Sequence, residues 1–509
     1  MIRTLCILLL LAMSAAAQQP PNIIVIISDD HAYQAISAYG SKLAQTPNID
    51  RIAREGAIFH NAFVNNSLCA PSRATLLTGK YSHSNGLTIN DFTQPFNVKQ
   101  QLFTRILQQH RYQTAWIGKW HLQTLPDGFD YWRILPDQGR YYNPDFISMQ
   151  GDTVRQQGYV TNIITDLTFD WINQRDRSKP FCIVVGEKAT HREWSPDLPD
   201  LGAYDHVQFP LPHDFYDDYK GRKAAADQDM SIRKTMTLGY DLKLHINYEK
   251  DHPYKFLSKE QREKFAAYYH NAVDKDFDEH HYTGDSLVRW KYQHYMRDYL
   301  STARSLDRNI GRILHYLDST GLAKNTIVIY MSDQGFYLGE HGWFDKRFMY
   351  EESMRTPMVM RYPGVIKPGT QVNEMVANVD IAPTLLQAAG VKVPADMQGR
   401  SLLPLFGKKT TWRKAVYYHY YEFGTHHVYP HFGVRTERYK LIRFYGPVDS
   451  WEFFDLQQDP HEIHNAYGEN RYQQEIAALR KELMQEVRQN GDTCAARILR
   501  NETTTAYSR

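Results

Sequence analysis

The chain has 509 residues and a formal net charge of +2, and hydrophobic residues make up 42% of it. This length exceeds that of one ordinary domain and predicts two unequal domains with a large core. The near-neutral charge balance argues against a nucleic-acid-binding protein, which would normally concentrate a strong basic excess.

Residues 1–17 have the features of a secretory signal peptide. Arg3 precedes an apolar stretch over residues 5–13, and small residues follow at 15–17. The apolar stretch is far shorter than the roughly 20 residues that a membrane helix needs, and no other stretch could span a bilayer. We therefore expect a soluble, exported mature protein that begins near Gln18 and is periplasmic, secreted or lysosomal, depending on its source.

Two runs of apolar and β-branched residues, 22–27 and 325–331, predict strands that are buried on both faces of a sheet. Each run is followed by side chains that carry oxygen, namely Asp29, Asp30, Asp333 and Gln334. Ligands of open α/β sheets gather beyond the carboxyl ends of the strands, so these side chains are expected to meet. Carboxylates in contact repel unless a cation neutralises them, and oxygen ligands suit Ca²⁺ or Mg²⁺. A solvated turn is the alternative for the Asp-Asp pair taken alone.

Two further predicted strands end in groups that can carry positive charge. The run at residues 112–121 ends in Lys119 and His121, and the run at 181–186 is followed by His191. Both strands would bring these side chains to the same edge of the sheet as the carboxylates.

The most distinctive stretch of the chain begins at Cys69. A Pro follows this cysteine after two residues and Arg73 after four, and the stretch continues to Lys80. A lone cysteine would be interpreted as a small buried residue. This longer pattern, together with Gly-Lys-Trp-His at residues 118–121, resembles the two signatures of the type I sulfatases.

The resemblance implies an enzyme that hydrolyses sulfate esters. In that family the cysteine, here Cys69, is oxidised by a maturation enzyme to formylglycine, whose hydrated form is a geminal diol. One hydroxyl of the diol forms a covalent sulfate ester, and deprotonation of the other expels sulfate and restores the aldehyde.

The resemblance also assigns a metal site and catalytic side chains. The metal ligands would be Asp29, Asp30, Asp333, Gln334 and the modified residue 69. Gln334 departs from the Asn that is more common in the family, and an all-oxygen ligand set favours Ca²⁺, with Mg²⁺ as the alternative, over zinc.

Five side chains receive catalytic roles from the same resemblance. Arg73 would neutralise the formylglycine alkoxide, while Lys119 and Lys346 would stabilise the sulfate oxygens. His121 would act as the base that releases sulfate, since the unperturbed pKa of histidine lies near neutral pH. His191 would protonate the leaving alkoxide or help to hold the sulfate, and a buried structural histidine is the alternative interpretation.

Asp345 and Arg347 flank Lys346 in the sequence. In a strand-like loop, their side chains would point the same way, away from that of Lys346. Two interpretations are equally supported by the sequence: a pair that recognises the hydroxyl groups of a sugar, and a surface salt bridge.

The rest of the chain is predicted to form an insertion, a long helix and a small C-terminal sheet. Residues 201–289 are polar and rich in tyrosine, which predicts an insertion of loops and short helices over the active-site face. Apolar residues at helical spacing predict an amphipathic helix over residues 300–317. Strands of a small antiparallel sheet are expected at residues 416–421, 432–435 and 439–444, and a closing helix at 473–487. Residues 451–456 resemble the usual C-terminal ending of sulfatases. His426, His427 and His431 fall in a loop that could border the substrate, and surface positions are the preferred interpretation.

The predicted architecture is α/β, with an alkaline-phosphatase-like large domain around a central mixed sheet at residues 18–410. A small C-terminal α+β domain would follow at 411–509. Among sulfatases, the nearest resemblance is to the N-acetylglucosamine-6-sulfatases, which implies 6-O-sulfated N-acetylglucosamine of glycosaminoglycans or mucins as the substrate. A sulfatase for another sulfated hexose, a phosphonate or phosphodiester hydrolase of the same superfamily, and a non-catalytic carbohydrate-binding relative are the alternatives.

Overall fold

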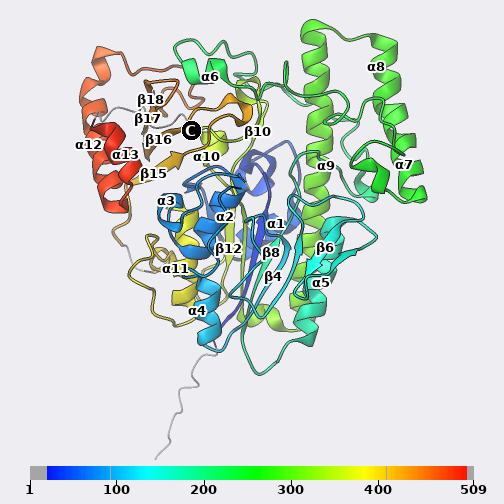
Figure 1. Ribbon diagram of the computed structural model, residues 1–509, viewed down its shortest axis with the longest axis horizontal. Coiled ribbons are helices and arrows are strands. Elements are labelled where there is room, and N and C mark those ends of the chain that lie inside the picture. The colour runs from blue at the N-terminus through cyan, green and yellow to red at the C-terminus, as the bar shows by residue number, and fades with distance from the viewer. Residues whose placement is uncertain (1–19, 92, 408–409, 501–509) are drawn as a thin grey trace, which may run out of the picture.

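The computed structural model describes residues 20–91, 93–407 and 410–500, so the predicted signal peptide lies outside the described residues. A ten-stranded sheet forms the centre of the molecule (Figure 1). Its five central strands are parallel and adjacent, in the order β9 (Thr326–Ser332), β1 (Asn22–Ser28), β8 (Phe181–Gly186), β4 (Gln113–Lys119) and β5 (Tyr131–Leu135).

Antiparallel pairings at both sides make this sheet mixed, as predicted. On one side β12 runs antiparallel to β9 and β2, and on the other β6 runs antiparallel to β5 and β7. The outer strands are β12 (Met358–Arg361), β2 (Ala57–Phe59), β13 (Thr370–Val372), β6 (Asp145–Ser148) and β7 (Thr153–Arg155).

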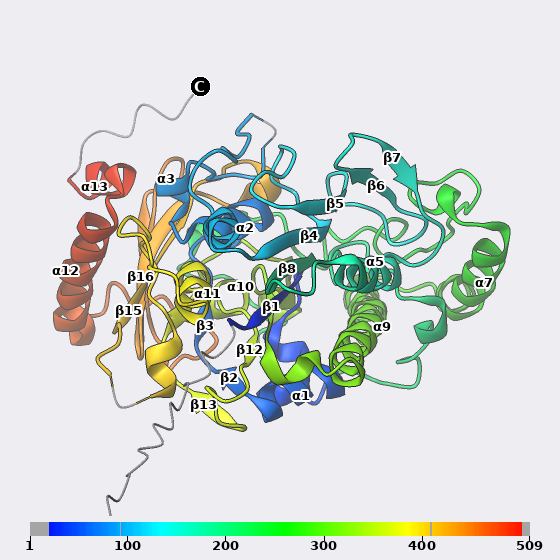
Figure 2. The same cartoon turned by 90° about the horizontal axis from the view of Figure 1, so that it is seen from below.

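Helices cover both faces of the sheet (Figure 2). Alternate residues of β1 pack against the helices on one face of the sheet or the other, because successive side chains of a strand point to opposite faces. Ile24 and Ile26 pack in one buried cluster, whereas Val25 belongs to the other. The first layer contains α1 (Pro47–Glu55), α5 (Val160–Gln174) and α9 (Gly284–Ser319), and the second contains α2 (Cys69–Thr78), α4 (Phe103–Gln109) and α11 (Ile381–Ala388).

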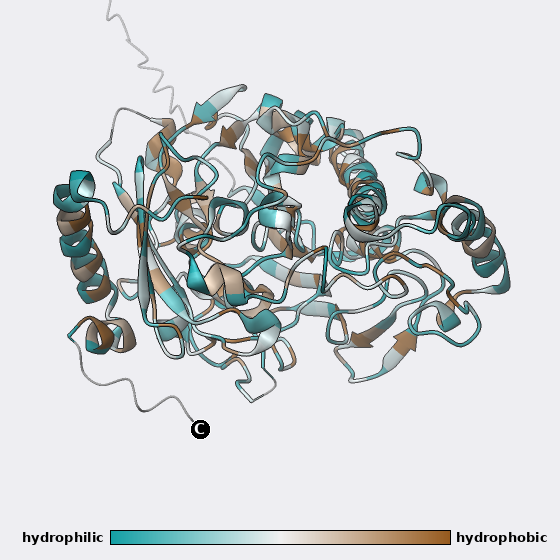
Figure 3. Ribbon diagram, turned by 90° about the horizontal axis from the view of Figure 1, so that it is seen from above, coloured by the Kyte–Doolittle hydropathy of each residue, from teal (hydrophilic) through white to brown (hydrophobic). Residues whose placement is uncertain are grey.

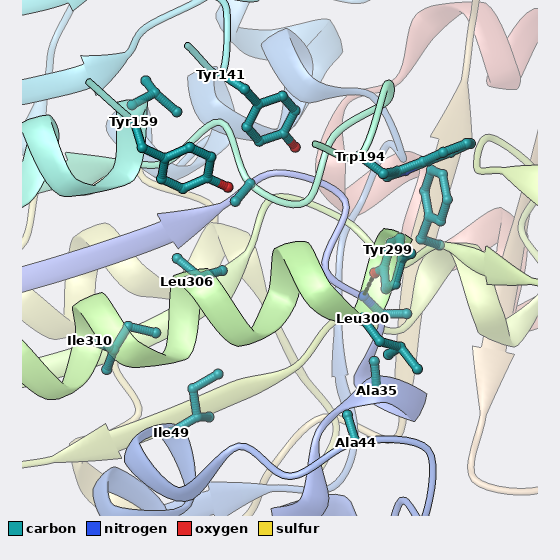
Figure 4. Close-up of a cluster of buried hydrophobic side chains, with 14 of the residues drawn as sticks. Ala35, Ala44, Ile49, Tyr141, Tyr159, Trp194, Tyr299, Leu300, Leu306 and Ile310 are labelled. Carbon is teal, nitrogen blue, oxygen red and sulfur yellow. Dashed lines mark hydrogen bonds between the residues drawn. The ribbon is translucent and has the colours of Figure 1, made fainter. Parts of the chain in front are cut away.

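The helix α9 is longer than the predicted amphipathic segment and begins at Gly284, inside the segment expected to be an insertion of loops. Its apolar stripe, including Leu306 and Ile310, packs against the sheet layer as predicted (Figure 4). The rest of the insertion consists of loops and the short helices α6 (Lys223–Asp227), α7 (Lys259–Tyr269) and α8 (Lys275–His280). Several of its aromatic side chains belong to the same buried cluster as α9, namely Tyr248, Tyr254, Phe265 and Tyr269.

A separate antiparallel sheet follows in the C-terminal part, as predicted. It consists of β15 (Ala415–Tyr420), β16 (His431–Thr436), β17 (Tyr439–Phe444) and β18 (Ser450–Asp455). The first three correspond to the predicted strands, and β18 is a fourth strand that was not predicted. The helix α12 (Gln473–Asn490) alternates hydrophobic and hydrophilic residues in Figure 3 and buries Leu479 and Leu483 against this sheet. The short helix α13 (Thr493–Leu499) ends the described chain.

The expectation that His431 lies at the surface is wrong. This residue begins β16 and is completely buried, and its ring accepts a hydrogen bond from the backbone amide of Met349. None of the helices in the described part of the chain is long and apolar enough to cross a membrane.

Candidate active site

The site forms where the carboxyl ends of four adjacent parallel strands meet. β1 ends just before Asp29, β9 just before Asp333, β4 at Lys119, and β8 shortly before His191. The register of these strands therefore brings together residues that are separated by up to about three hundred positions in the sequence, as the hydrogen bond from Asp30 N to Asp333 Oδ1 at 3.3 Å shows.

Three buried carboxylates form the centre of the site. Oxygen atoms of Asp29, Asp30 and Asp333 lie within 4.8 Å of one another, and none of these residues is more than 1% exposed. Burial, together with the charges of Asp29 and Asp333 and against the attraction of Lys346, raises the pKa of Asp30 to about 7. Burial is the largest cause of this shift, so ionised Asp30 depends on cations close to its carboxylate.

Gln334 completes a ligand set that fits a hard divalent cation. Its Nε2 lies 2.5 Å from Asp30 Oδ1, and its Oε1 is buried without a hydrogen-bond partner among the described residues. Three carboxylates and an unpartnered amide oxygen are the donors that Ca²⁺ and Mg²⁺ prefer, whereas zinc sites use histidine and cysteine.

Cys69 is the first residue of α2 and is completely buried beside this cluster. Its Sγ lies 3.4 Å from Asp29 Oδ1 and 3.4 Å from Lys346 Nζ. Burial raises the pKa of the Cys69 thiol to about 12. An unmodified thiol at this position is therefore protonated and a poor nucleophile, since the thiolate is the reactive form.

Three cations surround the carboxylates. Arg73 forms an ion pair with Asp333 at 2.9 Å and donates a second hydrogen bond to the backbone carbonyl of Lys119, also at 2.9 Å. Lys119 forms an ion pair with Asp29, and Lys346 Nζ lies 2.5 Å from Asp30 Oδ1. All three cations are buried, which strengthens their electrostatic effect on a bound anion.

The two predicted catalytic histidines are both held neutral. Burial and the charge of Lys119 lower the pKa of His121 to about 4, although its Nε2 lies 3.3 Å from Asp137 Oδ1. Burial also lowers the pKa of His191, whose Nε2 lies 3.7 Å from Asp30 Oδ2. A neutral imidazole can accept a proton, so His121 has the protonation state that a base requires.

Asp345 and Arg347 lie next to these groups as a buried pair. Their side chains are separated by 3.4 Å, and the residues are only 8% and 7% exposed. The pair forms a salt bridge, as one of the two interpretations held, but the salt bridge is buried and not at the surface. Asp345 ends β11 (Phe344–Asp345), which pairs with β10 (Tyr337–Leu338), and Arg347 lies in the loop that follows.

Two further residues contribute to this region. His426 comes from the C-terminal part, and its Nε2 lies 3.1 Å from Asp345 Oδ2, so the interpretation of its loop as one that could border the site agrees better with the structure than the preferred surface position. Gln138 accepts a hydrogen bond from Lys119 Nζ at 2.5 Å and contacts His121 Nε2 at 3.0 Å. Sequence reasoning missed Gln138, which lies in a loop without a recognisable pattern.

Residues 21–391 match the sulfatase family, and residues 339–489 match the C-terminal region of N-sulphoglucosamine sulphohydrolase. The chain belongs to the sulfatase family. It is a sulfuric ester hydrolase with the alkaline-phosphatase-like fold that the sequence predicted. The carboxylate cluster of this sulfatase is compatible with the divalent metal that the family uses.

Known proteins resemble this sulfatase over most of its length. An N-acetylglucosamine-6-O-sulfatase from Bacteroides thetaiotaomicron is 49% identical over 475 residues, which cover 90% of this chain and 84% of the relative. A solved structure described as a complex with its substrate D-glucosamine-2-N,6-O-disulfate has a TM-score of 0.91 at 47% identity, covering 94% and 99% of the two chains. A phosphonate monoester hydrolase of Agrobacterium radiobacter, at 19% identity, TM-score 0.69 and coverage of 92% and 96%, shares the fold.

Proposed function

We propose that this sulfatase removes the 6-O-sulfate of N-acetylglucosamine in glycosaminoglycan or mucin glycans. One observation carries the proposal: Lys119, Lys346 and Arg73 converge with three carboxylates on residue 69, and the buried pair of Asp345 and Arg347 lies beside them. The 49% identity to an N-acetylglucosamine-6-O-sulfatase supports this substrate over another sulfated hexose.

The cations are suited to bind the sulfuryl group. Lys346 Nζ lies 3.4 Å from the sulfur of Cys69, which stands where the oxygens of the modified side chain would lie. Lys119 and Lys346 would hold the sulfate oxygens and stabilise the charge that develops on them, because fixed cations in a buried site need no reorganisation. Arg73 would bind the alkoxide at residue 69 and keep it next to Asp333.

The two histidines would move protons. His121 is neutral and would take the proton from the spare hydroxyl at residue 69. The Nδ1 of His191 donates to the backbone carbonyl of Arg192, so its Nε2 would deliver a proton to the oxygen of the leaving sugar in the imidazolium form, which the bound anionic substrate and Asp30 would favour. Asp345 and Arg347 would bind hydroxyl groups of that sugar, since a buried carboxylate accepts and a guanidinium donates hydrogen bonds.

Two groups complete the site in this proposal. Asp29, Asp30, Asp333 and Gln334, together with residue 69, would hold Ca²⁺, which would supply positive charge beside the sulfate; Mg²⁺ is the alternative. Residue 69 would become formylglycine through a maturation enzyme and then supply the hydroxyl that takes up the sulfuryl group.

The proposal includes an exported protein. A signal peptide at residues 1–17 would direct export to the periplasm, the exterior or the lysosome, depending on the source. The catalytic domain would span residues 18–410, and a small C-terminal domain, which contributes His426 to the site, would span 411–509.

The test is sulfate release from a panel of defined sulfated monosaccharides and disaccharides. The protein is co-expressed with a maturation enzyme, peptide mass confirms the aldehyde at residue 69, and Ca²⁺ is present. We expect release from 6-O-sulfated N-acetylglucosamine. Sulfate release only from another sulfated sugar would overturn the proposed substrate. Hydrolysis of phosphonate or phosphate esters alone would overturn the proposed sulfate-ester chemistry.

A further inference from the structure

A pocket of about 330 Å³ adjoins the catalytic site on the side of His191. Its lining comes from the loop after β5, the loop after β8 and the insertion, and includes His191, Lys188, Arg192 and Tyr240. Among the described residues that line it, neither Cys69 nor Lys346 occurs. The pocket therefore borders the catalytic site, because it is lined by His191 and by Gln138, which contacts Lys119 and His121.

Lys188 differs from the other cations that line this pocket. Arg140 forms an ion pair with Asp145 at 2.7 Å, and Arg192 forms one with Asp241 at 2.5 Å. Lys188 is only 1% exposed, yet within the described parts of the chain it makes neither a hydrogen bond nor an ion pair. Its nearest recorded partner is the ring of Tyr141, whose centre lies 4.7 Å from Nζ.

The surroundings of Lys188 hold its side chain in place without a direct ion pair, although the carboxylates of Glu193 and Asp137 line the same pocket. The ring of Tyr141 is itself fixed, because its hydroxyl donates to the backbone carbonyl of His191 at 2.6 Å, and it belongs to the buried cluster drawn in Figure 4. Burial lowers the pKa of Lys188 by more than the carboxylates of Glu193, Asp29 and Asp137 raise it. A buried ammonium without a direct ion-pair partner is costly, and a bound anion reduces that cost.

We propose that Lys188 binds a second anionic group of the substrate, carried either by the sugar that holds the scissile sulfate or by its neighbour. The inference rests on the proposed function and extends it, because it makes the preferred substrate a glycan with at least two negative charges. An N-sulfo group on the same ring and the carboxylate of an adjacent uronic acid share this chemistry. In both cases an oxygen of the anion would accept a hydrogen bond from the ammonium of Lys188.

The test compares three substrates with the Ca²⁺-loaded, formylglycine-bearing protein. N-acetylglucosamine 6-sulfate has no second anion, glucosamine 2-N,6-O-disulfate carries it on the same ring, and a uronate-linked N-acetylglucosamine 6-sulfate carries it on the neighbour. We expect Lys188→Met to lower kcat/KM about 10- to 100-fold on one or both dianionic substrates, mainly through KM, because a charge-assisted hydrogen bond is lost. On the first substrate we expect less than a twofold change.

Two variants separate a substrate contact from a structural role. Lys188→Arg keeps the charge and should restore at least part of the preference for the dianionic substrate. Lys42→Met removes one exposed positive charge and should leave all three values unchanged. If Lys188→Met lowers kcat/KM equally on the three substrates, or lowers it on none, the inference is overturned while the proposed function stands.

A binding measurement distinguishes failure of the proposed function from failure of the inference about Lys188. Calorimetry with the Cys69→Ala variant needs no turnover, and there Lys188→Met should weaken the binding of the dianionic ligand selectively. A wild-type protein that releases no sulfate from any of the three sugars refutes the proposed function. Unchanged binding of the dianionic ligand by the double variant refutes the role of Lys188.

Discussion

Tyr299 of α9 donates the hydrogen of its hydroxyl group to the backbone carbonyl of Asp30 at 2.7 Å, and its oxygen accepts a hydrogen bond from the backbone amide of Ala32 at 2.8 Å. The side chain projects from the helix towards the loop that follows β1 (Figure 4). The longest helix of the molecule thus holds the backbone of a candidate metal ligand.

Replacement of Tyr299 by Phe should destabilise this loop. The buried carbonyl of Asp30 and the amide of Ala32 would lose a partner, which costs about 1–3 kcal/mol of unfolding free energy. We also expect weaker binding of Ca²⁺, measured from the shift of the thermal midpoint with Ca²⁺ concentration. Tyr316→Phe, at an exposed hydrogen bond near the other end of the same helix, is the control; equal effects of the two variants would contradict the prediction.

Cys69→Ala should abolish sulfate release and leave the fold intact. Residue 69 is the only side chain proposed to take up the sulfuryl group, whereas the loss of one buried sulfur changes the free energy of unfolding by only about 1 kcal/mol. Activity is measured as released sulfate, and folding by circular dichroism and the thermal midpoint. Release at the wild-type rate would refute the mechanism.

Lys346→Met should lower kcat by about 10²- to 10³-fold, because it removes a fixed cation from the place where charge develops on the sulfate. The variant also leaves the carboxylate of Asp30 without its closest cation, so the thermal midpoint should be recorded with each rate. Lys367→Met, at an exposed position, serves as the matched control. A loss confined to KM would show that Lys346 contributes only to substrate binding.

The acid limb of the pH profile should report on His121. Its pKa is lowered to about 4, so the neutral base is present above that pH and is lost as the pH falls through it. Asp137 favours the protonated form of His121, and Asp137→Asn should therefore move the acid limb of kcat/KM to lower pH. An acid limb that stays in place, or moves to higher pH, would exclude His121 as the titrating base.

Removal of divalent cations should inactivate and destabilise the protein. Asp29, Asp30 and Asp333 repel one another when ionised, and a bound cation at a hundred times its Kd stabilises the folded state by about 2.7 kcal/mol. Chelation should lower the thermal midpoint, and added Ca²⁺ should restore both midpoint and activity. A midpoint that is the same with chelator and with Ca²⁺ would argue against a metal at this cluster.

Much of the fold and of the candidate site could be predicted because the hydrophobic pattern of each strand lies within a few consecutive residues. The run at residues 22–27 has the apolar, β-branched composition of a strand buried on both faces, and β1 occupies the same place. The position of Asp29 after such a strand then follows from chain order alone. The same argument holds for Asp333 after β9 and for Lys119 at the end of β4.

Contacts between distant loops could not be predicted in this way. His426 meets Asp345 only because the C-terminal sheet packs on the large unit, and the sequence near residue 426 contains no periodic pattern that indicates this packing. A surface position is expected for His431, the first residue of β16, because polar residues usually lie at the surface. Its burial among aromatic rings depends on Phe444, its partner on the neighbouring strand, and on Phe348, which is far from it in the sequence.

The start of α9 was missed for a similar reason. Its first turns, from Gly284 onwards, carry many polar residues, and their apolar contacts are made with the insertion that folds over them. Local periodicity is therefore weak exactly where tertiary contacts stabilise the helix, although such contacts supply most helical stability in proteins.

The aromatic side chains of the insertion also determine how the enzyme meets its substrate. Tyr254 and Phe265 are part of the continuous interior that includes α9, so the wall they support around the pocket is already ordered before a sugar arrives. Binding to a preorganised wall loses little conformational entropy. Selectivity among glycans would then come from rejection of glycans whose shape or charge does not fit this rigid surface. A change of substrate preference would require substitution of side chains in this wall more than a change in the mobility of the insertion.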